Sequence, residues 1–219
     1  MTMRSNQRKA ESARPPSELT QARAFRTRTA VLQAAAKLFA QRGFASVTIL
    51  DIAEGAGITK GAVYFHFSNK EALAVELANA FYAAAPEVTA ALDDLESSAL
   101  ETLRDLVART ALQLRDDVIA QAAVRLQTER SDIDAELPPP FLDFIEATTL
   151  LLTRARDNGE LAPDVDPAVL GRTMVAAFFG VQHVSWVLHA RADLVERTEE
   201  LFDLLLPGGP DSADGPPRG

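Results

Sequence analysis

The residues best suited to chemistry begin at Thr59, where a hydroxyl, an ammonium group and two very small residues follow one another. Thr59 is a good N-cap, so we expect a helix to begin here. The amides at a helix N-terminus carry partial positive charge, and Lys60 adds a donor that can bond to guanine. Gly61 and Ala62 are small enough to let the backbone approach a partner closely. This combination favours hydrogen bonding to the edges of DNA bases.

A helix-turn-helix would position these groups. The first helix is expected to start at Ser46 or Val47 and to end at Gly55, because glycine tolerates the left-handed backbone that a sharp reversal needs. Ile58 then fills the corner, and the second helix continues to His66. In a helix-turn-helix the second helix enters the major groove of DNA.

The same stretch resembles the signature of TetR-family transcriptional regulators, in which a threonine precedes an I-A-x-x-A-G turn and a G-x-x-Y-x-H-F run follows. The matching positions are Thr48, Ile52, Ala53, Ala56, Gly57, Gly61, Tyr64, His66 and Phe67, with Lys70 closing the run. The resemblance implies a three-helix DNA-binding unit with backbone phosphate contacts from Thr27, Arg28, Thr48, Tyr64, His66 and Lys70. Taken by themselves, Tyr64 and His66 could instead pack within that unit.

Charge is distributed unevenly along the chain, although the formal net charge is −9. Residues 1–70 contain 11 Lys and Arg against 4 Asp and Glu, whereas residues 71–219 contain 11 against 27. A basic head on an acidic body is the distribution that DNA contact at one end requires.

Composition narrows the class of protein further. Of 219 residues, 47% are hydrophobic and 24% charged, which is ordinary for a soluble globular protein. The chain has no cysteine, so disulfides and thiolate metal sites are excluded. The N-terminus lacks the apolar core of a signal peptide, and we expect a cytoplasmic protein. The 3 histidines are scattered and no nucleotide or nucleophile motif is present, so we expect neither an enzyme nor a cofactor.

The apolar periodicity predicts an all-α fold of about nine helices. Besides the helix-turn-helix, these should cover residues 17–42, 69–85, 98–116, 118–130, 141–158, 167–190 and 193–205. The S-x-x-E spacing of Ser68 and Glu71 predicts a capping box for the helix that ends near Pro86. We expect a disordered basic tail over 1–16, a helix-turn-helix domain over 17–68, a ligand-binding and dimerisation domain over 69–207 and a disordered tail over 208–219.

The helix at 167–190 is apolar on two opposite stripes, one containing Phe178 and the other Trp186, so we expect it to be buried on both sides. Together with the last helix it has surplus apolar surface, which predicts a two-fold homodimer. Gln182 and His183 interrupt its apolar part, so a membrane span is not expected.

Beyond residue 71 the segments RLQTERSDIDAELPPPFLDFIEAT, GELAPDVDPAV and AAFFGVQHVS resemble one branch of the TetR family. This branch comprises the γ-butyrolactone-type autoregulator receptors of antibiotic-producing soil bacteria, including receptors for furan and butenolide signals. The resemblance implies that a small apolar ligand with a few polar groups enters the body and releases the DNA. The implied pocket residues are Tyr82, Gln127, Phe141, Phe144, Thr148 and Phe178.

The pocket residues have alternatives that the sequence leaves open. Phe141, Phe144 and Phe178 also stand at core spacing, whereas Gln127 and Thr148 lie on largely apolar faces, where a buried polar group needs a partner. Receptors of this branch often carry tryptophan where this chain has Phe144, and phenylalanine lacks the indole N–H donor.

The sequence therefore predicts a dimeric transcriptional repressor with three partners: an inverted-repeat DNA operator, a second copy of the chain and a small apolar signal. A butyrolactone, furan or butenolide would release it, and its targets would be antibiotic or other secondary-metabolite genes. A pseudo-receptor, or a sensor of antibiotics or other lipophilic compounds, is the alternative within regulators. A helical enzyme or adaptor is the alternative from another class.

Overall fold

The computed structural model describes residues 18–82 and 97–206, and every regular element in these ranges is helical. The predicted all-α fold with about nine helices is confirmed there. The α-helices are α1 (Glu18–Arg42), α2 (Ile49–Gly55), α3 (Lys60–His66), α4 (Lys70–Tyr82), α6 (Ala99–Asp116), α7 (Val118–Thr128), α8 (Leu142–Asp157), α9 (Pro167–His189) and α10 (Leu194–Leu205). A 3-10 helix covers Arg130–Asp132. The predicted tails and the helix end at Pro86 lie outside the described residues.

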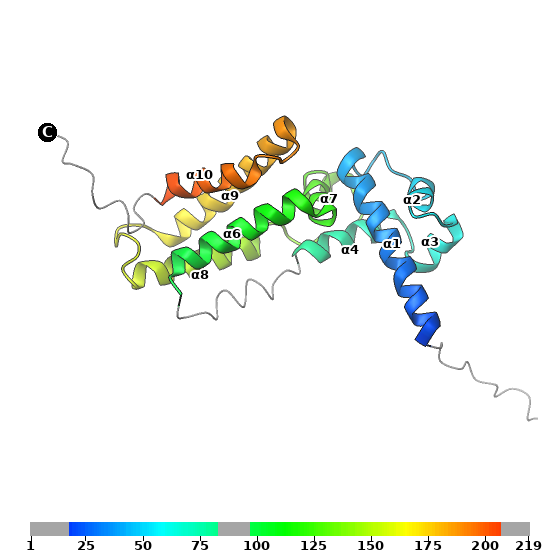
Figure 1. Ribbon diagram of the computed structural model, residues 1–219, viewed down its shortest axis with the longest axis horizontal. Coiled ribbons are helices and arrows are strands. Elements are labelled where there is room, and N and C mark those ends of the chain that lie inside the picture. Colours follow the sequence, from blue (N-terminus) through cyan, green and yellow to red (C-terminus); the bar gives the residue numbers. More distant parts are fainter. Residues whose placement is uncertain (1–17, 83–96, 207–219) are drawn as a thin grey trace, which may run out of the picture.

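The helices form an elongated molecule with two ends (Figure 1). We call α1–α3 the head and residues 97–206 the body. Within the head, α2 and α3 lie at the end farthest from α9 and α10, and α4 and α7 lie between the two ends.

Local hydrogen bonds explain why α2 and α3 meet at a tight corner. Thr48 caps α2, because its Oγ1 accepts from the Asp51 amide at 3.2 Å while the Asp51 carboxylate accepts from the Thr48 amide at 2.8 Å. Gly57 takes φ +67°, and the Ile58 amide returns to Ala53 O at 3.0 Å. Thr59 then caps α3 through the Ala62 amide at 3.2 Å.

The predicted capping box at the start of α4 is wrong by one residue. The cap is Asn69, whose Oδ1 accepts from the Ala72 amide at 2.8 Å. Phe67 ends α3 in an extended conformation and buries its ring in the core, so Ser68 comes one position too early to cap a helix that begins at Lys70.

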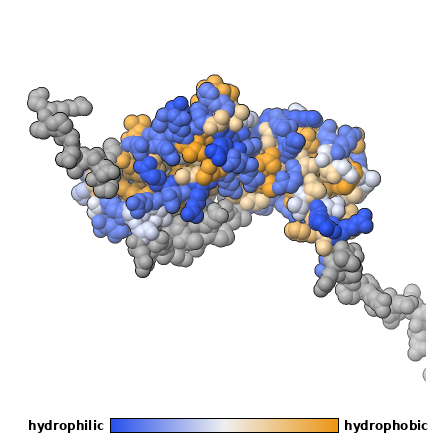
Figure 2. Space-filling model, in the orientation of Figure 1, coloured by the Kyte–Doolittle hydropathy of each residue, from blue (hydrophilic) through white to orange (hydrophobic). Residues whose placement is uncertain are grey.

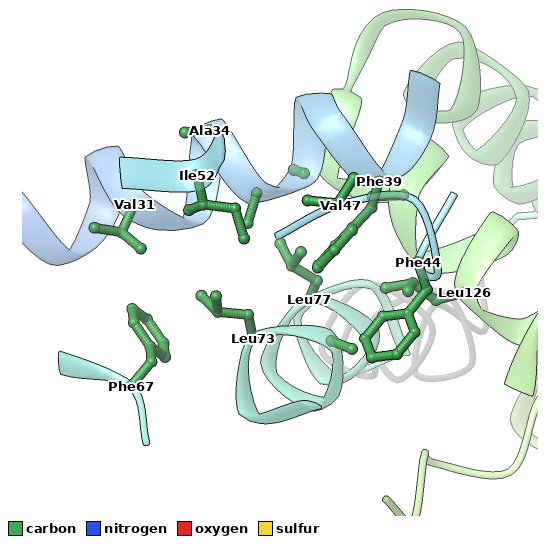
Figure 3. Packing of buried hydrophobic residues seen from close by; sticks show 14 of the residues in the cluster. Val31, Ala34, Phe39, Phe44, Val47, Ile52, Phe67, Leu73, Leu77 and Leu126 are labelled. Carbon is green, nitrogen blue, oxygen red and sulfur yellow. The ribbon is translucent and has the colours of Figure 1, made fainter. Parts of the chain in front are cut away.

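The core of the head is closed by helices from outside it. Val31 and Phe39 of α1 and Ile52 of α2 pack with Leu73 of α4 and Leu126 of α7 (Figure 3). A single core therefore crosses the predicted boundary between residues 68 and 69, which stays a prediction.

In the body, α8 packs on α9 so closely that the crossing depends on a glycine. A Cβ on Gly171 of α9 would lie 2.7 Å from Thr149 Oγ1 of α8. The start of α6 is held by Glu160, whose carboxylate accepts from Ser98 Oγ at 2.6 Å and from the Leu100 amide at 3.0 Å. We call this contact the α6 staple.

Candidate nucleic-acid interface and candidate ligand cavity

One face of α3 is open to solvent at the outer end of the head. Lys60, Gly61 and Tyr64 are all exposed on it, and Lys60 Nζ lies 5.8 Å from the centre of the Tyr64 ring. The nearest atom to a Cβ placed on Gly61 would be Thr59 Oγ1 at 3.9 Å, so nothing covers the backbone there. Ala62 adds only a methyl group. A flat partner can therefore approach this turn of α3 closely, with an amine and a phenol beside it.

Around α2 the predicted polar residues have structural roles as well. The Thr48 hydroxyl donates to Asp51 Oδ2 at 2.5 Å, and Arg42 Nη1 lies 3.6 Å from Asp51 Oδ1. Hydrogen bonds from Thr48, together with the charge of Arg42, hold the pKa of Asp51 below its ordinary value.

Two further predicted phosphate contacts lie on α1 and α3. The Thr27 hydroxyl donates to Arg23 O at 3.0 Å on α1, and His66 of α3 is half-buried. Phosphate contacts by Thr27, Thr48 and His66 stay predictions.

Two of the predicted phosphate contacts, Arg28 and Lys70, have partners within the chain. Arg28 pairs with Glu76 of α4, and its guanidinium lies 4.9 Å over the Phe67 ring. Lys70 Nζ donates to Phe44 O at 2.8 Å and lies 4.0 Å over the Phe44 ring. Both cations therefore tie α4 to the head, and their contact with phosphate stays a prediction.

A compact set of hydrogen bonds joins α7 to the end of α1. Glu129 accepts from the Phe44 amide at 2.6 Å and from Arg125 Nε at 2.8 Å, while Arg125 Nη1 donates to Ala40 O at 2.9 Å. Gly43 has φ +81°, and a Cβ on it would lie 2.6 Å from Glu129 Oε1. We call these five residues the joint, because they fix the head to the body at a point that admits no side chain.

Trp186 extends this contact toward α9. Its ring lies 5.5 Å from the Arg125 guanidinium and 5.0 Å from that of Arg191. Burial lowers the pKa of Arg191 to about 10. Trp186 is half-buried and contacts two guanidinium groups of its own chain, while a contact of the α9 helix with a partner chain stays a prediction.

The body contains a small apolar cavity of about 40 Å³ between α6, α8, α9 and α10. Its walls come from residues far apart in the sequence: Leu106, Val107, Thr110, Phe144, Thr148, Met174, Val175, Phe178, Phe179, Thr198, Leu201 and Phe202. Three of the predicted pocket residues, Phe144, Thr148 and Phe178, are among them. Ligand pockets usually measure about 300–1,000 Å³, so a ligand must push these side chains apart to enter.

The predicted residues Tyr82 and Phe141 lie beside this cavity without lining it. The Tyr82 ring contacts the Phe144 ring at 6.2 Å between centres, and its buried hydroxyl has no hydrogen-bond partner among residues 18–82 and 97–206. Burial raises the pKa of Tyr82, so the phenol stays protonated and can donate. Phe141 meets the Phe179 ring edge-to-face at 4.4 Å between centres. It has φ +69°, a left-handed conformation that costs a residue with a side chain about 1–3 kcal/mol. Strain of this kind is typical of functional segments.

Gln127 is buried, as its polar group on an apolar face suggested, but it does not line the cavity. Its Nε2 donates to Pro138 O at 2.9 Å, whereas its Oε1 has no hydrogen-bond partner in the part of the chain that the structure describes. The amide thus fastens the proline-rich loop to α7, and a role in ligand binding stays a prediction.

Sequence reasoning missed most of the cavity walls. Val107 and Thr110 on α6 and Leu201 on α10 stand at ordinary core spacing, so nothing in the sequence sets them apart. Phe179 is different, because it directly follows the predicted pocket residue Phe178, and the structure places both rings in the wall of the cavity. That signal was available.

An apolar groove runs along α9 and α10. It is lined by Ala177, Gly180, Val181, Val184, Ser185, Leu188, His189, Asp193, Arg197, Glu200, Leu201 and Leu204. Val184, Leu188 and Leu204 are 55%, 65% and 76% exposed. Figure 2 shows hydrophobic surface at the tip where α9 turns into α10. Exposed apolar surface on this scale marks a contact face.

Within residues 18–82 and 97–206, no helix has the length and apolar character needed to cross a membrane. In the same ranges no group of three His, Asp or Glu side chains is arranged to hold a metal ion.

Both parts of the chain match known families. Residues 31–77 match "Bacterial regulatory proteins, tetR family", and residues 97–209 match "Tetracyclin repressor-like, C-terminal domain". The chain is 36% identical over 188 residues to the A-factor receptor protein of Streptomyces griseus, a match that covers 85% of this chain and 65% of the receptor.

Two solved structures are similar over most of their length. One, described as the molecular basis for control of antibiotic production by bacterial hormones, is 45% identical with a TM-score of 0.72 and covers 82% of this chain and 95% of its own. The other, a gamma-butyrolactone receptor described as ArpA-like, is 30% identical with a TM-score of 0.67 and covers 84% and 98%.

Proposed function

The chain belongs to the TetR family of bacterial regulatory proteins, and we propose that it is a dimeric, cytoplasmic repressor that a small signal releases from DNA. The observation that carries this proposal is the position of α7. It packs on α1 and α4 at the head and on α6, which forms one wall of the cavity. A change of volume in the body can therefore reach the head.

On the DNA side, the proposal is supported by the open face of α3 and the basic charge of residues 1–70. A two-fold dimer would present one such face per chain. It should bind an inverted repeat whose half-sites lie about one helical turn apart, and its affinity should fall steeply as salt rises.

On the ligand side, the cavity offers apolar walls and a few hydroxyl groups. The Thr110 and Thr198 hydroxyls donate to carbonyls of their own helices at 2.9 and 2.7 Å, so each keeps lone pairs that can accept. The buried Tyr82 hydroxyl, whose ring contacts Phe144 of the cavity wall, can act as a donor if the cavity expands. A lactone, furan or butenolide with an alkyl tail suits this chemistry, and the similar proteins described as receptors for A-factor and gamma-butyrolactone support the same class.

Release follows from the small size of the cavity. A ligand shifts an equilibrium only if it prefers one conformation, and about 40 Å³ leaves no room for one in the closed body. The ligand would bind an expanded body, in which α6 moves and takes α7 and α4 with it. The two heads of the dimer would then lose the spacing of the half-sites.

The test is operator release measured against concentration for a butyrolactone, a butenolide and a furan. Thr148→Val keeps the shape of the cavity wall and removes one hydroxyl, so it should retain DNA binding and need about fivefold more ligand, equivalent to about 1 kcal/mol. Thr173→Val is the matched control, because Thr173 is exposed on α9 and outside the cavity.

Two results would change the proposal. If Thr148→Val and wild type respond alike while Gln127→Leu loses its response, the ligand sits against the unpaired Gln127 Oε1 instead. If none of the three compounds releases the wild type, the receptor proposal fails. The chain would then be a pseudo-receptor, an alternative that Phe144 in place of tryptophan supports.

A further inference from the structure

Phe65 is the most exposed large apolar side chain in the described residues, at 81%. It lies on α3, at the end of the molecule farthest from α9 and α10 (Figure 1). A single exposed aromatic residue needs no explanation on most surfaces. On α3, however, Phe65 lies beside the open face of Lys60, Gly61 and Tyr64, so the partner that approaches this face can also contact the Phe65 ring.

The rotation of α3 about its axis is fixed, so the ring cannot turn inward. Val63 is fully buried and Phe67 is 4% exposed, and both pack in the core of the head. Phe65 lies between them in sequence and projects from the opposite side. Among the aromatic rings of the described residues, its ring contacts that of His66, edge-to-face at 5.1 Å between centres.

The neighbours of Phe65 leave its ring as the most prominent group on that side of the helix. Side chains on a helix lean toward its N-terminus, so Phe65 extends over the turn that holds Gly61 and Ala62. Gly61 has no side chain and Ala62 only a methyl group. A surface that approaches this turn meets the Phe65 ring first.

The chemistry of the ring then limits what it can recognise. Phenylalanine has neither donor nor acceptor, so it can bond to no phosphate and no polar base edge. In the major groove, bases present polar atoms with one exception, the C5-methyl group of thymine. We propose that Phe65 packs against a thymine methyl in each half-site and thereby selects sequence. The inference depends on the DNA binding proposed above.

The experiment begins with operators selected from a random duplex library by the purified full-length chain at a fixed salt concentration. Each thymine in a half-site is then replaced singly by deoxyuridine, which removes only the methyl group. For the wild type, one such replacement should weaken binding about fourfold, the value of one buried carbon. For Phe65→Ala the same replacement should have no effect, so the two changes are not additive. Phe25→Ala is the matched control, because Phe25 is 72% exposed on α1.

The possible outcomes separate this inference from the function on which it rests. If wild type selects an operator but no thymine methyl depends on Phe65, the inference is wrong and DNA binding stands. It is also wrong if Phe65→Ala weakens all sequences equally. If wild type selects no sequence at all, the proposed function itself fails. Unchanged thermal unfolding of Phe65→Ala would show that the variant is folded.

Discussion

The α2–α3 corner of the head and the cavity of the body are formed by contacts that differ greatly in sequence distance. In the head, Thr48 and Asp51 cap α2 across three positions, and the Ile58 amide returns to Ala53. In the body, the cavity walls run from Leu106 to Phe202. Short-range contacts determine the shape of the α3 face that we propose binds DNA, whereas long-range packing forms the cavity that we propose for the ligand.

The two regions also differ in how ready they are for a partner. The α3 face is open and its helix is fixed by Val63, so the DNA binding that we propose for this face would not require the helix to rearrange. The cavity measures about 40 Å³ and must expand to admit the proposed ligand. A regulator needs this asymmetry, because only a site that changes shape can report on its ligand. The joint between Glu129 and Phe44 is where the rigid region meets the adaptable one.

The largest expected effect comes from Leu188→Asp in the apolar groove of α9 and α10. Leu188 is 65% exposed in the single chain, so the monomer should fold. In a dimer the new carboxylate would be buried without a partner, which costs several kcal/mol. Since two linked heads bind about 10²–10⁴-fold more tightly than one, operator affinity should fall by that factor.

Sedimentation and operator binding would be measured together for this variant. Leu112→Asp is the control, because Leu112 is 40% exposed on α6, outside the groove. A Leu188→Asp protein that stays dimeric would show that another surface forms the dimer. Operator binding by the head would then not depend on the groove of α9 and α10 as we propose.

The sequence distance between contacting residues also decides which features the sequence could predict. The corner between α2 and α3 was predictable, because Thr59 and the Gly55 to Gly57 turn encode it within a few residues. Even there, the cap of α4 was misassigned, since Ser68 and Asn69 are both good caps and only the burial of Phe67 decides between them.

The body was predictable as helices but not as a cavity. Periodicity located α8 and α9, yet it could not tell a wall residue from a core residue such as Leu151, because both are apolar and at the same spacing. Nor does the sequence pattern indicate that the Trp186 ring contacts two guanidinium groups, those of Arg125 on α7 and of Arg191 just after α9.

A smaller effect is expected from Gly43→Ala at the joint. A left-handed residue with a side chain costs about 1–3 kcal/mol, and here the methyl group would also displace Glu129 and Arg125. The variant should melt at a lower temperature than wild type and bind its operator more weakly, because the head loses its fixed position. Thermal unfolding and operator affinity would be measured on the same preparation.

Gly159→Ala separates the two causes. Gly159 has φ +79° and nothing within 4 Å of a Cβ, so its substitution introduces the backbone strain alone. The excess destabilisation of Gly43→Ala over Gly159→Ala is then the contribution of the joint. Equal destabilisation, with operator affinity unchanged in both, would refute the role of the joint.

The smallest effect is a pH dependence confined to the body, in the α6 staple. Burial raises the pKa of Glu160, but hydrogen bonds from Ser98, Leu100, Ala99 and Asn158 outweigh it and hold the pKa below its ordinary value of 4.5. The folded state therefore favours the charged carboxylate. Its stabilising contribution is present above pH 4.5 and is lost as the pH falls through the lowered pKa.

Glu160→Gln removes that titration, so its melting temperature should lie below that of wild type near pH 7 and approach it as the solution is acidified below pH 4.5. Operator affinity near pH 7 should not change, because the staple lies at the end of the body away from the head (Figure 1). Glu101→Gln, an exposed carboxylate in the first turn of α6, is the control for a lost charge at the same helix end. Melting curves for the three proteins across pH 3 to 8 would check this.

A difference in melting temperature between wild type and Glu160→Gln that stays constant with pH would show that the carboxylate acts by shape alone. A loss of operator affinity would show that the two regions communicate through the far end of α6 as well as through the joint.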